Sequence, residues 1–208
     1  MGTTTQQPRH VTNLNFHGIG RPLGRDFGEG ERDFWVKPEI FEATLDAAAL
    51  RDNVVLSFDD GNTTDVDIAL AALQERGLQA TFFIVPSWLG NPGFMTKADV
   101  RTLVASGMTV GNHGLQHHRW TELGRPELEH EVSAGRQMLE ELTGAEIETV
   151  AIPYGAYNDL VLDTLRDYRH VFTSDGGSAD PEAWLQSREH VRADQTAAEV
   201  QQLLDSAL

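Results

Sequence analysis

The stretch from Val54 to Gly61, VVLSFDDG, joins a short β-branched and aromatic run to two adjacent carboxylates and a glycine. A run of this length and composition predicts a β-strand over residues 54–58. In residues 65–77, DVDIALAALQERG, apolar residues recur at helical spacing before Gly77, which can end a helix. The segment therefore predicts a strand followed by a helix.

The same alternation continues along the chain. Strands that alternate with helices favour parallel pairing with right-handed crossovers, and a chain of 208 residues fits one α/β domain. We therefore expect an α/β fold with a single domain. The further predicted strands are residues 80–85, 108–111, 149–152 and 171–173, and the further predicted helices are residues 96–107, 126–143, 158–168 and 196–208.

The first 50 residues have a different character. They contain one short strand candidate, residues 14–16, followed by a Gly- and Arg-rich loop with few periodic apolar residues. This loop could be a lid over a site or an irregular segment that plugs one end of the sheet, and the sequence leaves both open.

The composition limits the partners. A formal net charge of −16 and a pI near 4.7 argue against an extended surface for nucleic acid or an anionic membrane. The chain has no Cys, so a metal would be bound by His, Asp or Glu. No apolar signal core or membrane span is visible, and we expect a cytoplasmic protein.

Three strand ends carry the candidate chemistry, because functional residues of parallel α/β folds follow the carboxyl ends of strands. Asp59 and Asp60 end the first strand, and His113 and His117 follow a later one, four residues apart. We expect these histidines on one face of a helical turn, where both can bind one metal ion with Asp60. Asp59 would point elsewhere, as neighbours in a strand do, and stay free to move protons. The Pro-Tyr-Gly at 153–155 predicts a rigid turn whose backbone N–H groups point inward.

These segments resemble the motifs of the polysaccharide deacetylases with a NodB homology domain, carbohydrate esterase family 4, over roughly residues 50 to 190. The first motif appears as Ser57 to Gly61, the second as His113 to His117 and the third as Ala151 to Gly155. The resemblance implies a distorted (β/α)7-type barrel, with residues 51–208 as the deacetylase domain and residues 1–50 packed on it.

The resemblance also implies roles for single residues. A divalent ion, with zinc as the first expectation, would be bound by Asp60, His113 and His117. Asp59 would be the general base, and the backbone N–H of Tyr154 would bind the developing oxyanion. Pro153, Tyr154 and Gly155 would contact the substrate.

Departures from the family pattern leave further residues open. The family's third motif begins with an arginine that pairs with the base, but this chain has Ala151. Arg188 is our candidate replacement, and the alternative is that it is an ordinary surface arginine. The family's C-terminal Leu-x-His is not found, since His190 stands in the wrong surroundings for that motif. We predict that His17 replaces it as general acid, unless it only packs or caps. Gly114 replaces a Ser or Thr. Asp175 could line the rim or form an ordinary turn.

We therefore predict a metal-dependent hydrolase that removes N-acetyl groups from an N-acetylated sugar. The same residues could hydrolyse another amide or an O-acetyl ester. A carbohydrate-binding module without turnover is the alternative that the missing Arg and Leu-x-His favour. The presence of the base and all three ligands favours an enzyme. We expect a carbohydrate substrate and, from the net charge, no nucleic-acid or membrane partner. The substrate's length and the oligomeric state are not indicated.

Overall fold

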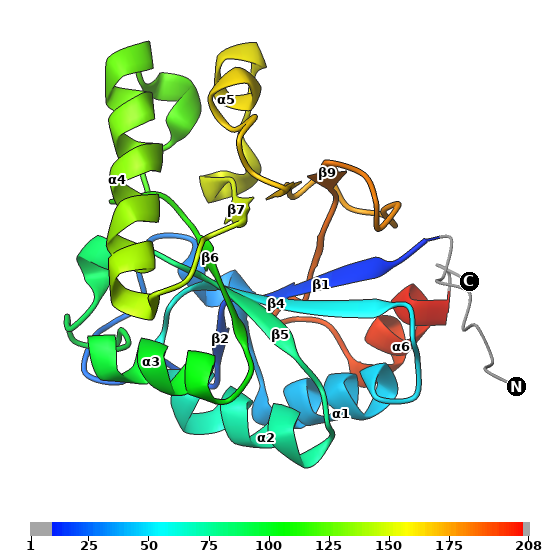
Figure 1. Ribbon diagram of the computed structural model, residues 1–208. Coiled ribbons are helices and arrows are strands. Elements are labelled where there is room, and N and C mark those ends of the chain that lie inside the picture. The colour runs from blue at the N-terminus through cyan, green and yellow to red at the C-terminus, as the bar shows by residue number, and fades with distance from the viewer. Residues whose placement is uncertain (1–9, 206–208) are drawn as a thin grey trace, which may run out of the picture.

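Eight parallel strands form the central sheet of the computed structural model, which describes residues 10–205 (Figure 1). The first and last strands in the spatial order, β10 and β9, are consecutive in the chain, so the sheet curls back on itself. From edge to edge the strands are β10 (Glu189–His190), β1 (Thr12–Phe16), β4 (Val54–Asp60), β5 (Ala80–Ile84), β6 (Thr109–Asn112), β7 (Thr149–Ala151), β8 (His170–Phe172) and β9 (Leu185–Gln186).

The two edges of the sheet meet at the beginning of β1. The side-chain amide of Asn13 donates hydrogen bonds to Oε1 of Gln186 at 3.1 Å and to the carbonyl of Ser187 at 2.9 Å. With β9 and β10 taken as one interrupted strand, the sheet has seven strand positions. The predicted distorted (β/α)7-type barrel in a single domain is confirmed.

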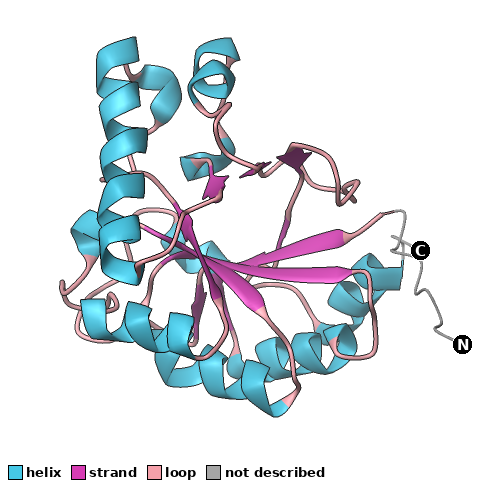
Figure 2. Ribbon diagram, in the orientation of Figure 1, coloured by secondary structure: helices cyan, strands magenta, loops and turns pink. Residues whose placement is uncertain are grey.

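Helices cover the outside of the curled sheet (Figure 2). Helix α1 packs against α6 and α2, and α3 packs against α4. No helix in residues 10–205 has the length and apolar character that crossing a membrane requires. The helices are α1 (Pro38–Ala48), α2 (Leu70–Glu75), α3 (Lys97–Ala105), α4 (Arg125–Thr143), α5 (Asp159–Thr164) and α6 (Ala197–Asp205).

A row of stacked phenylalanines fixes the register of three central strands. Phe16, Phe58 and Phe82 are paired across β1, β4 and β5, and their ring centroids lie 5.2 and 4.8 Å apart. All three side chains are fully buried, and each such burial contributes roughly 2–3 kcal/mol. Side chains alternate between the two faces of a strand, so His17 and Asp59, each next to one of these rings, face the barrel interior.

The predicted strands are confirmed with shifted ends. Strand β4 runs two residues beyond its predicted end, so that both aspartates belong to it. The helix expected over residues 65–77 begins with a π-helical turn, Asp65–Ala69, and continues as α2. Helix α5 ends at Thr164, before the predicted residue 168.

The first 50 residues contain more regular structure than expected. Strand β1 is an inner strand of the sheet, and a short parallel pair, β2 (Gly18–Ile19) and β3 (Trp35–Val36), follows it. Helix α1, which the sequence analysis missed, begins with Pro38 and buries Phe41 and Leu45. A proline in the first turn and apolar residues four apart are helix signals that were present in the sequence.

Candidate active site

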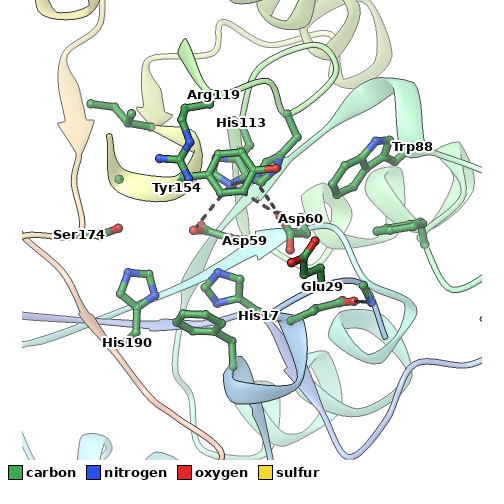
Figure 3. A pocket seen from close by; sticks show the side chains of 18 of the residues that line it. His17, Glu29, Asp59, Asp60, Trp88, His113, Arg119, Tyr154, Ser174 and His190 are labelled. Atoms are coloured by element: carbon green, nitrogen blue, oxygen red, sulfur yellow. Dashed lines mark hydrogen bonds and ion pairs between the residues drawn. The ribbon is translucent and has the colours of Figure 1, made fainter. Parts of the chain in front are cut away.

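A pocket of about 850 Å³ opens at the carboxyl ends of the strands (Figure 3). Asp59 and Asp60 of β4 line it together with His113 and His117, which follow β6, and Tyr154, which follows β7. The structure thus brings the three predicted segments together at the carboxyl ends of the strands.

Asp60 reaches this pocket because the backbone leaves strand geometry at that residue. Neighbouring residues of a regular strand point to opposite faces, which would turn Asp60 away from Asp59. Asp60 instead has a φ of 79°, and Gly61 has a φ of 78°. This left-handed turn brings both carboxylates into the pocket, and the expectation that Asp59 points elsewhere as a strand neighbour is wrong.

The expected helical turn over the two histidines is also wrong. Residues 113–119 form a loop in which Gly114 has a φ of 78° and His117 a φ of 60°. The buried Glu131 of α4 holds this loop, since its carboxylate accepts the backbone N–H of Gln116 at 2.8 Å. A carboxylate buried on an otherwise apolar helix face is the signal that could have identified Glu131.

The loop turns both imidazoles toward Asp60. The Nε2 atoms of His113 and His117 lie 3.2 Å apart and 3.7 and 3.5 Å from Oδ1 of Asp60. The Nδ1 of His113 is 2.9 Å from the carbonyl of Ala151, so the ring donates there and presents an unprotonated Nε2 to the pocket.

These three residues fit a divalent cation. Their ligand atoms all lie within 4.8 Å of one another, and the buried Oδ1 of Asp60 accepts no hydrogen bond. A buried carboxylate oxygen without a partner is costly unless a cation or a proton is bound to it. Two imidazoles and one carboxylate are a ligand set that zinc accepts.

The electrostatics of the three residues agree with that fit. Burial, followed by the charge of Asp59, raises the pKa of Asp60 to about 8. Burial lowers the pKa values of His113 and His117. Neutral imidazoles are the form that binds a metal, and a divalent cation would favour the ionised form of Asp60.

Asp59 is held by a buried arginine. Arg188 donates from Nη1 to Oδ1 of Asp59 at 2.7 Å and from Nη2 to Oδ2 at 2.9 Å. Both residues are at most 2% exposed. The guanidinium also lies over the rings of Phe83 and Phe172. The structure therefore places Arg188 where the sequence analysis proposed it, as the charge partner of Asp59.

Asn15 of β1 completes the surroundings of Asp59. Its Nδ2 donates to Oδ2 of Asp59 at 2.9 Å, and its Oδ1 accepts from Ser57 and Arg188. The sequence analysis missed Asn15, because its contacts with Asp59 and Arg188 join residues 44 and 173 positions apart in the chain. Burial would raise the pKa of Asp59, but Arg188, His113 and His17 outweigh it and hold this pKa well below its usual range. Asp59 is therefore ionised at neutral pH.

The Pro-Tyr-Gly turn forms the opposite wall. Tyr154 has a φ of 59°, and its ring contacts that of His117 with centroids 4.6 Å apart. The guanidinium of Arg119 also lies over the Tyr154 ring, 4.6 Å from its centroid. Tyr154 and Gly155 line the pocket, whereas Pro153 is buried beneath the turn and does not.

His17 and His190 lie side by side in the pocket. Their ring centroids are 5.3 Å apart, and both rings contact Phe34. Burial lowers the pKa of His17 to about 4. The sequence analysis noted His190 but judged its surroundings unsuitable, because the pairing of β10 with β1 that brings it to His17 is not visible locally.

Asp175, by contrast, does not line the pocket. Its exposed carboxylate accepts hydrogen bonds from the hydroxyls of Tyr157 and Thr173, both at 2.8 Å. The preceding residue, Ser174, lines the pocket instead.

The Gly- and Arg-rich loop after β2 forms a wall of the pocket. Arg25 pairs with Glu31, donates to Asn62 at 2.9 Å and lies over the ring of Phe94. The Glu31 carboxylate also accepts from the indole N–H of Trp35 at 3.0 Å. These contacts hold the loop against the barrel where it lines the pocket, which favours a cover over the site, the first alternative, over a segment that only plugs one end of the sheet.

We predict that Arg188→Met destabilises the chelator-treated protein by about 3–5 kcal/mol at pH 7, because it leaves the charge of Asp59 buried without a partner. Burial then raises the Asp59 pKa above its unfolded value, so the variant loses stability as pH rises above about 4. In the wild type the same pKa is lowered, and its contribution is lost as pH falls. The deficit should therefore shrink in acid.

Urea unfolding at pH 7 and pH 4 measures this deficit. Arg101→Met on the exposed face of α3 is the matched control and should stay within about 0.5 kcal/mol of the wild type. An Arg188→Met deficit below about 1 kcal/mol, or one that grows in acid, would contradict the role of the ion pair.

Comparisons with known proteins agree with the geometry. The family model described as polysaccharide deacetylase matches residues 47–172. The chain is 32% identical over 114 residues to the chitooligosaccharide deacetylase of Sinorhizobium fredii. The matched region covers 54% of this chain and 51% of that protein. The chain is 28% identical over 114 residues to the peptidoglycan-N-acetylglucosamine deacetylase PgdA of Listeria monocytogenes, covering 54% of this chain and 23% of PgdA.

A solved structure extends the likeness to nearly the whole chain. The deacetylase PplD of Streptococcus pyogenes, in complex with acetate, superimposes with a TM-score of 0.82 and 17% identity over 95% of this chain and 99% of PplD. That likeness shows a common fold. Because the family model matches more than half of this chain, the chain belongs to the polysaccharide deacetylase family.

Proposed function

We propose that this protein is a metal-dependent N-deacetylase that releases acetate from an N-acetylated sugar. The observation that carries the proposal is that two neighbouring carboxylates, Asp59 and Asp60, have different partners. Asp60 converges with His113 and His117 on one point, whereas Asp59 is held apart by Arg188. A ligand set beside a separate ionised carboxylate is the arrangement that metal-assisted hydrolysis requires.

Asp60, His113 and His117 would hold the cation, with zinc as the first choice for two imidazoles and one carboxylate. Such a cation, when bound, supplies an acidified water and a positive charge near the acetyl carbonyl. Other divalent metals also accept imidazole and carboxylate ligands, so this ligand set does not select zinc alone.

Asp59 would accept the proton of the attacking water. Its carboxylate is ionised and fixed by three hydrogen bonds, two from Arg188 and one from Asn15. Its Oδ2 lies 3.8 Å from Nε2 of His113, so the base stands directly beside the proposed ligands. The three hydrogen bonds hold the proposed base in one orientation, as general base catalysis requires.

The backbone N–H of Tyr154 would stabilise the oxyanion that forms from the acetyl carbonyl. The left-handed conformation of Tyr154 places this turn at the pocket wall beside His117. One well-aimed donor of this kind contributes on the order of 3 kcal/mol to the barrier. Gly155 leaves room for the Ser174 side chain, whose Cβ would lie 2.6 Å from a Cβ at position 155.

His17 would donate a proton to the leaving amine. Its position beside Asp59 supports this role, and its pKa of about 4 opposes a charged ring in the resting pocket. The proton that Asp59 takes from water would pass to His17, since both side chains line the pocket. The role therefore requires His17 to gain its proton during the reaction.

Two alternatives use the same residues differently. Hydrolysis of an O-acetyl ester or another amide needs the same ligands and base, and substrate comparison separates it from sugar N-deacetylation. A carbohydrate-binding module without turnover was favoured by the absent third-motif arginine. The ion pair of Arg188 with Asp59 supports the enzyme, because it supplies that charge from another segment.

We predict about one equivalent of divalent metal by elemental analysis and acetate release from short N-acetylglucosamine oligomers or small N-acetyl glycosides. Removal of the metal by a chelator should abolish the release, and added zinc should restore it. Asp60→Asn should lose both metal and activity, since it removes one of three ligands. Stoichiometric metal without acetate from any N-acetyl sugar would sink the proposal, and O-acetyl sugars would then be tested.

We also predict that His17→Ala lowers kcat on N-acetyl sugars by roughly 10²–10⁴, the range of general acid–base catalysis. Turnover of p-nitrophenyl acetate should fall far less, because its leaving group departs without protonation. His130→Ala on the exposed face of α4 is the matched control. An equal loss on both substrates, with metal content unchanged, would exclude His17 as the acid.

A further inference from the structure

His190 is a pocket residue to which the proposed reaction gives no role. It lies on β10, with its backbone paired to Asn15 of β1, and its ring lines the pocket next to His17. In Figure 3, His17 and His190 lie on one side of Asp59, and His113 and Tyr154 lie on the other. His190 therefore faces the part of the pocket away from the proposed metal ligands.

The orientation of the Asn15 amide follows from its two charged neighbours. Arg188 can only donate hydrogen bonds, so the atom 2.9 Å from its Nη1 must be the amide oxygen. The ionised Asp59 can only accept, so the atom 2.9 Å from its Oδ2 must be the amide nitrogen. The hydroxyl of Ser57, which donates to the amide oxygen at 2.7 Å, agrees with this assignment.

The amide orientation in turn fixes the tautomer of His190. The Asn15 nitrogen also lies 3.3 Å from Nδ1 of His190, and an amide nitrogen can only donate. Nδ1 is therefore an acceptor, and the proton of the neutral ring is on Nε2. Burial, followed by the charges of His17 and Arg188, lowers the pKa of His190 to about 3, which agrees with a neutral ring.

The Nε2–H of His190 is a free donor at the pocket wall. Among the hydrogen bonds of residues 10–205, the His190 side chain makes one, and that one is at Nδ1. Phe34 packs edge-on against the ring with centroids 5.6 Å apart, and His17 lies on another side of it. The ring is thus held in place by its neighbours while its N–H remains available for a ligand in the pocket.

We propose that His190 is a specificity-determining residue that donates a hydrogen bond from Nε2 to a hydroxyl oxygen of the sugar unit carrying the acetyl group. The inference rests on the proposed function, because that reaction places the acetyl carbonyl near Tyr154 and leaves the sugar to the other side of Asp59. A neutral donor at that position selects for a hydroxylated substrate. Asn15 is then a positioning residue that aligns both Asp59 and His190.

Two substitutions separate the two nitrogens of the ring. The Oδ1 of asparagine stands close to the position of Nδ1, so His190→Asn keeps an acceptor for Asn15 and loses the donor in the pocket. The Nε2 of glutamine stands close to the position of the histidine Nε2, so His190→Gln keeps the donor and loses the acceptor. A role toward the sugar and a role toward Asn15 therefore predict opposite rankings of the two variants.

The test compares kcat/KM for a short N-acetylglucosamine oligomer with kcat/KM for p-nitrophenyl acetate, which has the acetyl group and no sugar. We expect His190→Asn to lose roughly tenfold in this ratio, the effect of one lost hydrogen bond, and His190→Gln to stay within about threefold of the wild type. Thermal unfolding and metal content are measured on both variants, and His190→Asn should fold with its metal bound.

Three results would overturn the assignment. A wild-type ratio in His190→Asn excludes a contact with the sugar. A loss in His190→Gln as large as that in His190→Asn, or larger, assigns the ring to the support of Asn15, as would failure of His190→Asn to fold. A wild-type protein that hydrolyses p-nitrophenyl acetate and no N-acetyl sugar refutes the proposed function, and this inference with it.

Discussion

The buried ion pair between Asp59 and Arg188 is the contact on which the rest of the site depends. Moving two charges out of water costs several kcal/mol for each ion, and only good geometry offsets that cost. Here the pair is bidentate, Asn15 donates a third hydrogen bond to the carboxylate, and Phe83 and Phe172 cover the guanidinium.

The same pair also connects distant parts of the barrel. Asp59 ends the central strand β4, and Arg188 lies between β9 and β10, where the two edges of the sheet meet. One contact therefore takes part both in the closure of the barrel and in the ionisation of Asp59. A change that loosened the closing segment would also raise the pKa of Asp59, since burial alone favours the neutral carboxyl.

Sequence patterns predicted the elements whose signals are local. Strand β4 and helix α4 follow from apolar periodicity, and the convergence of Asp60 with His113 follows from the parallel sheet. Asn15 and His190 were not predicted, because their roles depend on the pairing of β1 with β10, which joins residues 175 positions apart. The helical turn predicted at His113 and His117 was wrong for another reason. A loop with two left-handed residues can also bring side chains four positions apart to the same side.

The left-handed residues have a common location. Among residues 10–205, the residues other than glycine with positive φ are Asp60, His117 and Tyr154, and all three line the pocket. Such conformations cost of order 1–3 kcal/mol each and persist only where surrounding contacts impose them. Asp60 and His117 would bind the metal, and the backbone N–H of Tyr154 would bind the oxyanion. The backbone strain therefore lies at residues whose orientation the proposed reaction requires. A motif can therefore lose its arginine at Ala151, whose carbonyl still orients His113. Arg188, between β9 and β10, places its positive charge against Asp59 from another part of the chain.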